Sequence, residues 1–326
     1  MLANRLIATA GALLLGAAPA LAFQSPDPPT VTFEAPTFHV QGSSFDVELT
    51  IQAGPNGSTA AAWWLSPAGF LVNGEPVERR EGDALFELAP NSTLSLSYDL
   101  GPFLENASDF ELSFARGAYG GEPISVSVFE GVTTEGEGAV NLLEASADEL
   151  SSYLAIIDTS QGTMVAEFWP ETAPGHVRNF LDLCASGFYD GTKFHRVMPG
   201  FMIQGGDPLT KDDGASSRWG TGSGPRKLEA EFSNRKHERG VLSMARLGSD
   251  VNSATSQFFV CHQRAASLDG SYTAFGNLIS GFETLDRITS VDLVNQPKVN
   301  PAQRDERSRP GEPQILERAL VVKRPE

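Results

Sequence analysis

Apolar and polar residues alternate over short stretches of the first half of the chain, which is the pattern of half-buried β-strands. The alternation is clearest over 45–51 and 94–98. Glycine, proline and asparagine residues separate such runs and indicate turns. Several short strands at this spacing predict a β-sandwich-like domain over 23–132. We expect the adjacent Trp63 and Trp64 to anchor its core.

The pattern changes at residue 153, where two β-like runs precede a helical pattern. Thr172 is the expected N-cap of this helix, and Pro174 fits its first turn. Its apolar face consists of Val177, Phe180, Leu181 and Cys184. Further β-like runs follow at 193–198, 201–204, 241–245, 257–260, 274–275 and 317–322, with a second helix over 282–288. Many strands with only two helices predict an antiparallel barrel that these helices cap. The overall fold class is therefore mainly β.

The first 22 residues have the three-part pattern of a secretory signal peptide. Arg5 precedes an apolar run, and a small-x-small cleavage site ends at Ala22. We predict that residues 1–22 are removed from an exported protein, periplasmic or extracellular; a retained membrane anchor is the alternative. No later stretch of sequence is long and apolar enough to span a bilayer.

Residues 133–150 are rich in glutamate and glycine and predict an acidic linker that ends in a short helix. The linker joins the β-sandwich-like domain, 23–132, to a second domain, 151–326.

Negative charge is concentrated in the front of the chain. The formal net charge is -17, and residues 23–150 hold 20 acidic against 3 basic side chains, whereas 151–326 hold 21 against 20. An acidic surface disfavours nucleic acid and anionic lipid as partners. A solubilising surface explains the charge better than an acidic docking face does.

The sequence contains no signature of a hydrolase, a metal site or a nucleotide-binding loop. The five histidines have no ligand spacing, so we expect neither a metal nor a cofactor. Cys184 and Cys261 both lie among apolar residues, and we interpret them as buried free thiols.

One dense segment, 193–207, mixes large apolar side chains with polar ones. Strand alternation places Phe194, Arg196 and Met198 on one side. After a Pro-Gly turn, the returning strand brings Gln204 close to them. Such a hairpin predicts an arginine and a glutamine beside an apolar surface.

The segment also resembles the cyclophilin family. The family pattern F-H-R-V-x-P-G-F-M-I-Q-G-G-D stands unbroken over 194–207. It is followed in order by Gly240-Val241-Leu242-Ser243-Met244-Ala245, Ser256-Gln257-Phe258-Phe259-Val260, Leu268-Asp269-Gly270 and Phe275-Gly276. The resemblance covers about 153–324 and implies an eight-stranded antiparallel β-barrel capped by two helices. It is closest to an exported member of bacterial type.

The resemblance also implies roles for individual residues. Arg196 corresponds to the catalytic residue. The expected pocket for the substrate proline ring consists of Phe201, Met202, Phe259 and Leu268. Gln204 and Gln257 would hold polar groups of the peptide, and the backbone at Ala245 and Arg246 would pair with it. Tyr272 stands where the family often has a pocket histidine. Ser267 replaces a frequent tryptophan, which predicts weak cyclosporin binding.

The predicted function is peptidyl-prolyl cis-trans isomerisation of exported proteins, that is, a folding catalyst without a cofactor. Its partners would be proline-containing polypeptides, and we expect a monomer. The alternative is a proline-peptide binding or adhesion module with little turnover, driven by the N-terminal β domain. Retention of both Arg196 and Gln204 favours the enzyme, because a simple clamp has no need for both.

Overall fold

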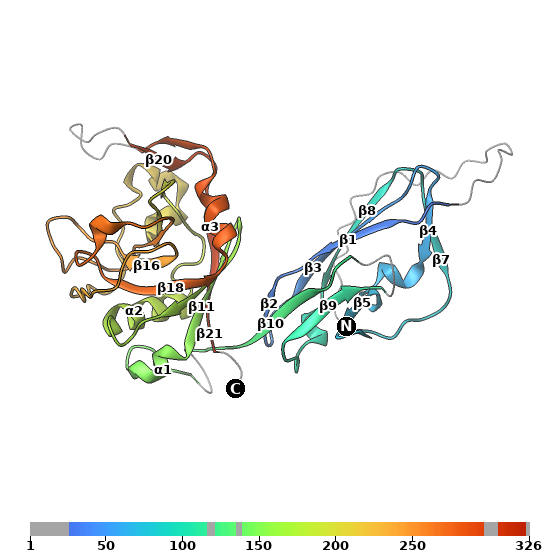
Figure 1. Cartoon of the computed structure of the whole chain (residues 1–326), viewed down its shortest axis with the longest axis horizontal. Coiled ribbons are helices and arrows are strands. Elements are labelled where there is room, and N and C mark those ends of the chain that lie inside the picture. The colour runs from blue at the N-terminus through green and yellow to red at the C-terminus, as the bar shows by residue number, and fades with distance from the viewer. Residues whose placement is uncertain (1–25, 116–120, 135–138, 297–305, 324–326) are drawn as a thin grey trace. The chain divides into compact units, whose positions relative to one another are not determined.

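The computed structural model describes residues 26–115, 121–134, 139–296 and 306–323 (Figure 1). The predicted signal peptide lies outside the described residues. The described residues divide into two compact units, the first ending at Glu130 and the second beginning at Gly131.

The first unit is built almost entirely of strands, as its alternating sequence predicts. Strands β1, β3 and β8 form an antiparallel sheet, and β4 pairs with β7. Strand β9 pairs with β5 and β10, while β6 pairs with β5 and β2 runs parallel to β10. The strands are β1 (Thr30–Glu34), β2 (Phe38–Val40), β3 (Asp46–Gln52), β4 (Ser58–Ala61), β5 (Phe70–Val72), β6 (Glu75–Pro76), β7 (Leu85–Leu88), β8 (Thr93–Asp99), β9 (Phe110–Phe114) and β10 (Ile124–Gly131). The mainly-β class is confirmed, whereas a sandwich arrangement stays a prediction.

The core of the first unit is aromatic and aliphatic. In β3, Val47, Leu49 and Ile51 are fully buried, so the period-two pattern read from the sequence marks the inward face. Trp64 is 6% exposed and packs edge-on against Phe114 at 5.6 Å between ring centroids, as expected of a core anchor.

The second unit contains a sheet in which β14, β15, β17, β16, β18, β12, β11 and β21 follow one another. Every pairing along this path is antiparallel. The strands are β11 (Tyr153–Thr159), β12 (Gly162–Phe168), β14 (Arg196–Met198), β15 (Met202–Gly205), β16 (Val241–Met244), β17 (Phe258–Cys261), β18 (Ala274–Ser280) and β21 (Ile315–Lys323).

The predicted closed barrel is not seen among the described residues. Among the described residues no hydrogen-bonded pairing joins β14 directly to β21. The short strand β13 (Thr192–Lys193) pairs with β21, and the chain then passes through Phe194 and His195 into β14. The two ends of the sheet are therefore linked by the chain rather than by a continuous ladder.

Two helices pack against this sheet, α2 (Pro174–Ala185) and α3 (Phe282–Thr289). The predicted apolar face of α2 is fully buried. The predicted N-cap is wrong: Ala173 occupies that position, and the Thr172 hydroxyl donates to the Trp169 carbonyl. The Glu231 carboxylate takes over the capping, because it accepts the N–H groups of Gly175 and His176, each at 3.0 Å.

The region expected as a linker contributes to the second unit. Leu142, Ala145 and Leu150 are buried in the same hydrophobic cluster as the inward-facing residues of the sheet. The short helix α1 (Ala147–Ser151) begins with a capping box between Ser146 and Glu149. These contacts place residues 139–150 with the second unit.

In the described part of the chain no helix has the length and apolar character needed to cross a membrane. Cys184 and Cys261 are free and buried, and burial raises the pKa of the Cys261 thiol to about 12.

Candidate active site

Three neighbouring strands line up the polar and apolar side chains of the candidate site. Arg196 of β14 lies opposite Gln204 of β15, and Gln204 lies opposite Phe259 of β17. Side chains of residues directly opposite in a sheet share one face. Strand register thus places Arg196, Gln204 and Phe259 in one row.

The other face of the same strands packs in the core of the second unit, where Val197, Ile203 and Val260 are fully buried. Alternation assigns Phe194 to the Arg196 side, and here the prediction is wrong. Phe194 packs in the interior cluster, because β13 ends at Lys193 and β14 begins only at Arg196. The irregular segment between them breaks the period of two.

The four residues expected to hold a proline ring come together in a small apolar cluster on the outer face. Met202 and Phe259 form its floor, with 2% and 4% exposure, while Phe201 and Leu268 are half-buried beside them. Ala245 and Tyr272 pack against the same cluster, and Tyr272 contacts Phe259 edge-on at 5.8 Å between ring centroids. A partly open apolar surface with an aromatic floor suits a small saturated ring.

A chain of amide hydrogen bonds positions the two glutamines. Gln204 Nε2 donates to Gln257 Oε1 at 3.0 Å. Gln257 Nε2 in turn donates to the carbonyls of Gly220 and Gly222, at 3.1 and 2.8 Å. The two glutamines thus form one polar unit beside Arg196.

The loop that receives Gln257 depends on Asp207, whose carboxylate is completely buried. Its Oδ1 accepts the Leu209 N–H at 2.8 Å, and its Oδ2 accepts the N–H groups of Gly220 and Gly222. The last residue of the 194–207 motif therefore shapes the loop behind the glutamines.

Arg246 has a larger part than its predicted backbone role. Its guanidinium lies 4.6 Å from the Tyr272 ring centroid, and its Nε and Nη2 donate to the Ser271 carbonyl at 3.1 and 2.9 Å. The side chain therefore holds the segment that carries Tyr272 against the apolar cluster. The neighbouring Ala245 N–H pairs with the Gln257 carbonyl at 2.9 Å.

Behind the apolar cluster lies a buried histidine whose contacts the sequence did not predict. His237 is fully buried and stacks on Phe259 at 6.1 Å between ring centroids. Its ring nitrogens contact Asp269 Oδ1 at 3.2 Å and Ser243 Oγ at 3.0 Å. Burial lowers the pKa of His237, and its ring supports Phe259 from below. No spacing rule joins this histidine to the Leu-Asp-Gly motif.

The guanidinium of Arg196 is held by a carboxylate that sequence reasoning also missed. Arg196 Nε contacts Glu306 Oε1 at 2.6 Å, and Nη2 contacts Oε2 at 3.1 Å. Both side chains are about one-third exposed, at 32% and 34%. The hydrogen bonds from Arg196 hold the pKa of Glu306 below its usual value.

His195, next to Arg196 in the chain, is buried, and its Nδ1 has no hydrogen-bond partner among the described residues. Burial lowers the pKa of His195 to about 4. Because the unfolded chain takes up this proton near pH 6.5, stability is present above that pH and is lost as the pH falls toward 4. We expect His195 to reduce the free energy of unfolding by about 2 kcal/mol between pH 7 and pH 5.

Guanidinium chloride unfolding of the wild type and of His195→Asn at both pH values checks this expectation. The variant should lose about 2 kcal/mol less than the wild type over this interval. An identical pH dependence in the two proteins would contradict the assignment.

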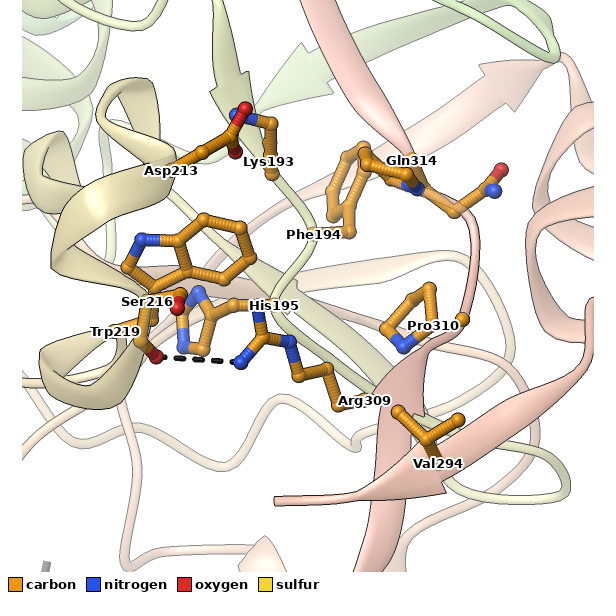
Figure 2. A pocket seen from close by; sticks show the side chains of 12 residues that line it. Lys193, Phe194, His195, Asp213, Ser216, Trp219, Val294, Arg309, Pro310 and Gln314 are labelled. Atoms are coloured by element: carbon orange, nitrogen blue, oxygen red, sulfur yellow. Dashed lines mark hydrogen bonds and ion pairs between the residues drawn. The ribbon is translucent and has the colours of Figure 1, made fainter. Parts of the chain in front are cut away.

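A separate pocket of about 350 Å³ is lined in part by the 193–195 segment. It contains none of the ten predicted site residues. Its walls include Trp219, Arg309 and Gln314, which Figure 2 shows around the cavity. Among the described residues no group of three or more histidine, cysteine, aspartate or glutamate side chains gathers as a metal site.

The profile of the family described as "Cyclophilin type peptidyl-prolyl cis-trans isomerase/CLD" matches residues 154–306. The chain is 45% identical over 132 residues to peptidyl-prolyl cis-trans isomerase CYP18-1 of Arabidopsis thaliana, covering 40% of this chain and 78% of that protein. It is 40% identical over 148 residues to a peptidyl-prolyl cis-trans isomerase of Synechococcus elongatus, covering 43% of this chain and 95% of that protein.

Among solved structures, a cyclophilin type peptidyl-prolyl cis-trans isomerase of Cryptosporidium parvum is 32% identical, with a TM-score of 0.44. The match covers 53% of this chain and 98% of that one.

Proposed function

The chain belongs to the cyclophilin family of peptidyl-prolyl cis-trans isomerases, and we propose that it accelerates X-Pro rotation in exported proteins with Arg196 as its catalytic residue. The observation that carries the catalytic assignment is the row of Arg196, Gln204 and Phe259 on one face of the sheet. The apolar cluster around Phe259 adjoins this row.

The reaction needs a site of this kind and no covalent step. Resonance gives the X-Pro bond a rotation barrier of about 18–20 kcal/mol, so that uncatalysed exchange takes tens of seconds or longer. At the twisted transition state the prolyl nitrogen becomes pyramidal and gains a lone pair. A donor that binds this nitrogen stabilises the transition state over both planar isomers.

Arginine suits this role because its guanidinium stays charged and has five N–H donors in a rigid plane. In our proposal the apolar cluster of Phe201, Met202, Phe259 and Leu268 holds the proline ring. Gln204 and Gln257 bind the carbonyl side of the peptide, and the Ala245–Arg246 backbone pairs with its chain. The ring stays fixed while the carbonyl side turns.

Export is supported by the signal-like pattern of residues 1–22. We propose a periplasmic or extracellular protein of bacterial type, cleaved after Ala22. Mass spectrometry of the full chain, produced in a bacterium and recovered from the periplasm, tests this. A mature N-terminus at Phe23 is expected, and full-length protein retained in the cytoplasm would contradict it.

The front unit is the candidate for a second role, recruitment of unfolded clients, since it has its own core and lies outside the residues that the family profile matches. The test compares residues 131–326 with the full chain; the shorter piece begins at 131 because Leu142 and Leu150 belong to the isomerase core. Equal rates on a short X-Pro peptide, with a slower proline-limited refolding reaction for the piece alone, are expected. Loss of peptide activity in the piece alone would show that the front unit is needed for turnover itself.

A further inference from the structure

The contact between Arg196 and Glu306 is a two-point clamp. Two guanidinium nitrogens face two carboxylate oxygens, at 2.6 and 3.1 Å. Parallel bonds of this kind fix the plane of the guanidinium as well as its position. An arginine that is one-third exposed would otherwise sample many rotamers, because its side chain has several rotatable bonds.

The carboxylate is itself held in place. Glu306 directly precedes β20 (Arg307–Pro310), which pairs with β19 (Leu293–Asn295) to form a hairpin. Ser308 Oγ donates to Glu306 Oε1 at 2.6 Å. Gln296 Nε2 contacts Ser308 Oγ at 3.2 Å and donates to the His195 carbonyl at 2.7 Å. The hairpin is thus tied to the residue that precedes Arg196.

The base of the hairpin is fixed on its other side by the pocket of Figure 2. The Arg309 guanidinium lies 4.2 Å from the Trp219 ring centroid, and its Nη1 donates to the Ser216 carbonyl at 3.3 Å. Lys193, which also lines this pocket, donates hydrogen bonds from Nζ to Asp213 Oδ1 and to the Thr210 carbonyl, at 2.9 and 2.7 Å. Glu306 therefore projects from a backbone that is anchored at several points.

From this geometry we infer that Glu306 is a positioning residue, which orients the guanidinium of Arg196 for isomerisation. The clamp occupies Nε–H and one N–H of Nη2, and it leaves the N–H donors of Nη1 and the second of Nη2 for the substrate. The inference rests on the proposed catalytic role of Arg196. It adds to that role a reason why the guanidinium needs no reorganisation when the prolyl nitrogen becomes basic.

The experiment is a double-mutant cycle on the full chain, with a proline-containing peptide as substrate. Glu306→Gln keeps the size of the side chain but removes its charge and one acceptor. We expect kcat to fall roughly 10-fold with KM nearly unchanged, because the donor is misplaced rather than lost. In the Arg196→Ala background, Glu306→Gln should not lower kcat further, since Glu306 acts only through Arg196.

Asp158→Asn is the matched control. Asp158 Oδ2 accepts two hydrogen bonds from Arg318, at 3.3 and 2.9 Å, on strands that carry no predicted site residue. This variant should keep wild-type activity.

Two results would overturn the inference while leaving Arg196 catalytic. One is an unchanged or higher kcat in Glu306→Gln. The other is an equal fall in kcat on Glu306→Gln in the wild type and in Arg196→Ala, which would show that Glu306 only stabilises the hairpin. If Arg196→Ala itself retains full activity, the catalytic assignment fails together with the role of Glu306.

Discussion

Arg196→Ala should lower kcat/KM for an X-Pro peptide by roughly two to three orders of magnitude, the loss typical of removing a preorganised hydrogen-bond donor. The protein should stay folded, because the Arg196 side chain is one-third exposed and lies on the outer face of β14. The apolar cluster that receives the proline ring is untouched, so peptide binding should weaken far less than turnover does. A protease-coupled isomerase assay measures the effect.

Arg318→Ala is the control for losing a surface arginine, since Arg318 also pairs with a carboxylate and lies on β21. It should leave kcat/KM unchanged. Arg196→Lys should recover little activity, because an ammonium keeps the charge but lacks the planar set of donors. A fully active lysine variant would mean that charge alone drives the reaction.

Asp207→Asn should have the largest effect on stability, with a loss of about 2–4 kcal/mol in the free energy of unfolding. The buried carboxylate accepts three backbone N–H groups, from Leu209, Gly220 and Gly222. Asparagine turns one acceptor into a donor that faces those N–H groups. Activity should fall as well, because the displaced loop carries the carbonyls that hold Gln257. Thermal unfolding and the peptide assay measure the two effects.

Asp212→Asn, five residues away in the same loop, is the matched control for Asp207. Its Oδ1 accepts a single exposed bond from the Gly214 N–H, at 2.8 Å. A loss below about 1 kcal/mol is expected for this variant. Equal costs for Asp207→Asn and Asp212→Asn would refute the structural role assigned to Asp207.

The alternation and helical spacing of apolar residues predicted those features of the fold that depend on residues close together in the chain. The eight strands of the main sheet of the second unit and the buried face of α2 follow from periodicity, whereas β19 and β20 were not predicted. The pocket residues expected from the family motif do lie in one apolar cluster. Strand register, which depends on the alternation of apolar and polar residues, aligns β15 with β17 at this cluster. The face on which Phe194 lies was predicted wrongly, because the two-residue break between β13 and β14 cannot be predicted from side-chain types.

Contacts between distant segments were not predictable. Glu306 lies 110 residues beyond Arg196 in a run of mixed charges, where every acidic side chain looks alike in the sequence. Glu231 caps α2 from 55 residues away, which is why a nearby threonine was the wrong choice. Nothing in the sequence distinguishes His237 from the other histidines, and its stacking on Phe259 is visible only in the fold. Such pairings depend on tertiary packing, for which local propensity holds no information.

Catalysis by Arg196 is tested most directly by NMR exchange spectroscopy of a proline peptide bound to the full chain and to Arg196→Ala. The measurement separates binding from rotation on the enzyme. We expect the variant to bind the peptide with a similar Kd but no longer to speed its cis-trans exchange. Exchange at the wild-type rate on the variant would contradict this expectation, because rotation would then need no donor from Arg196.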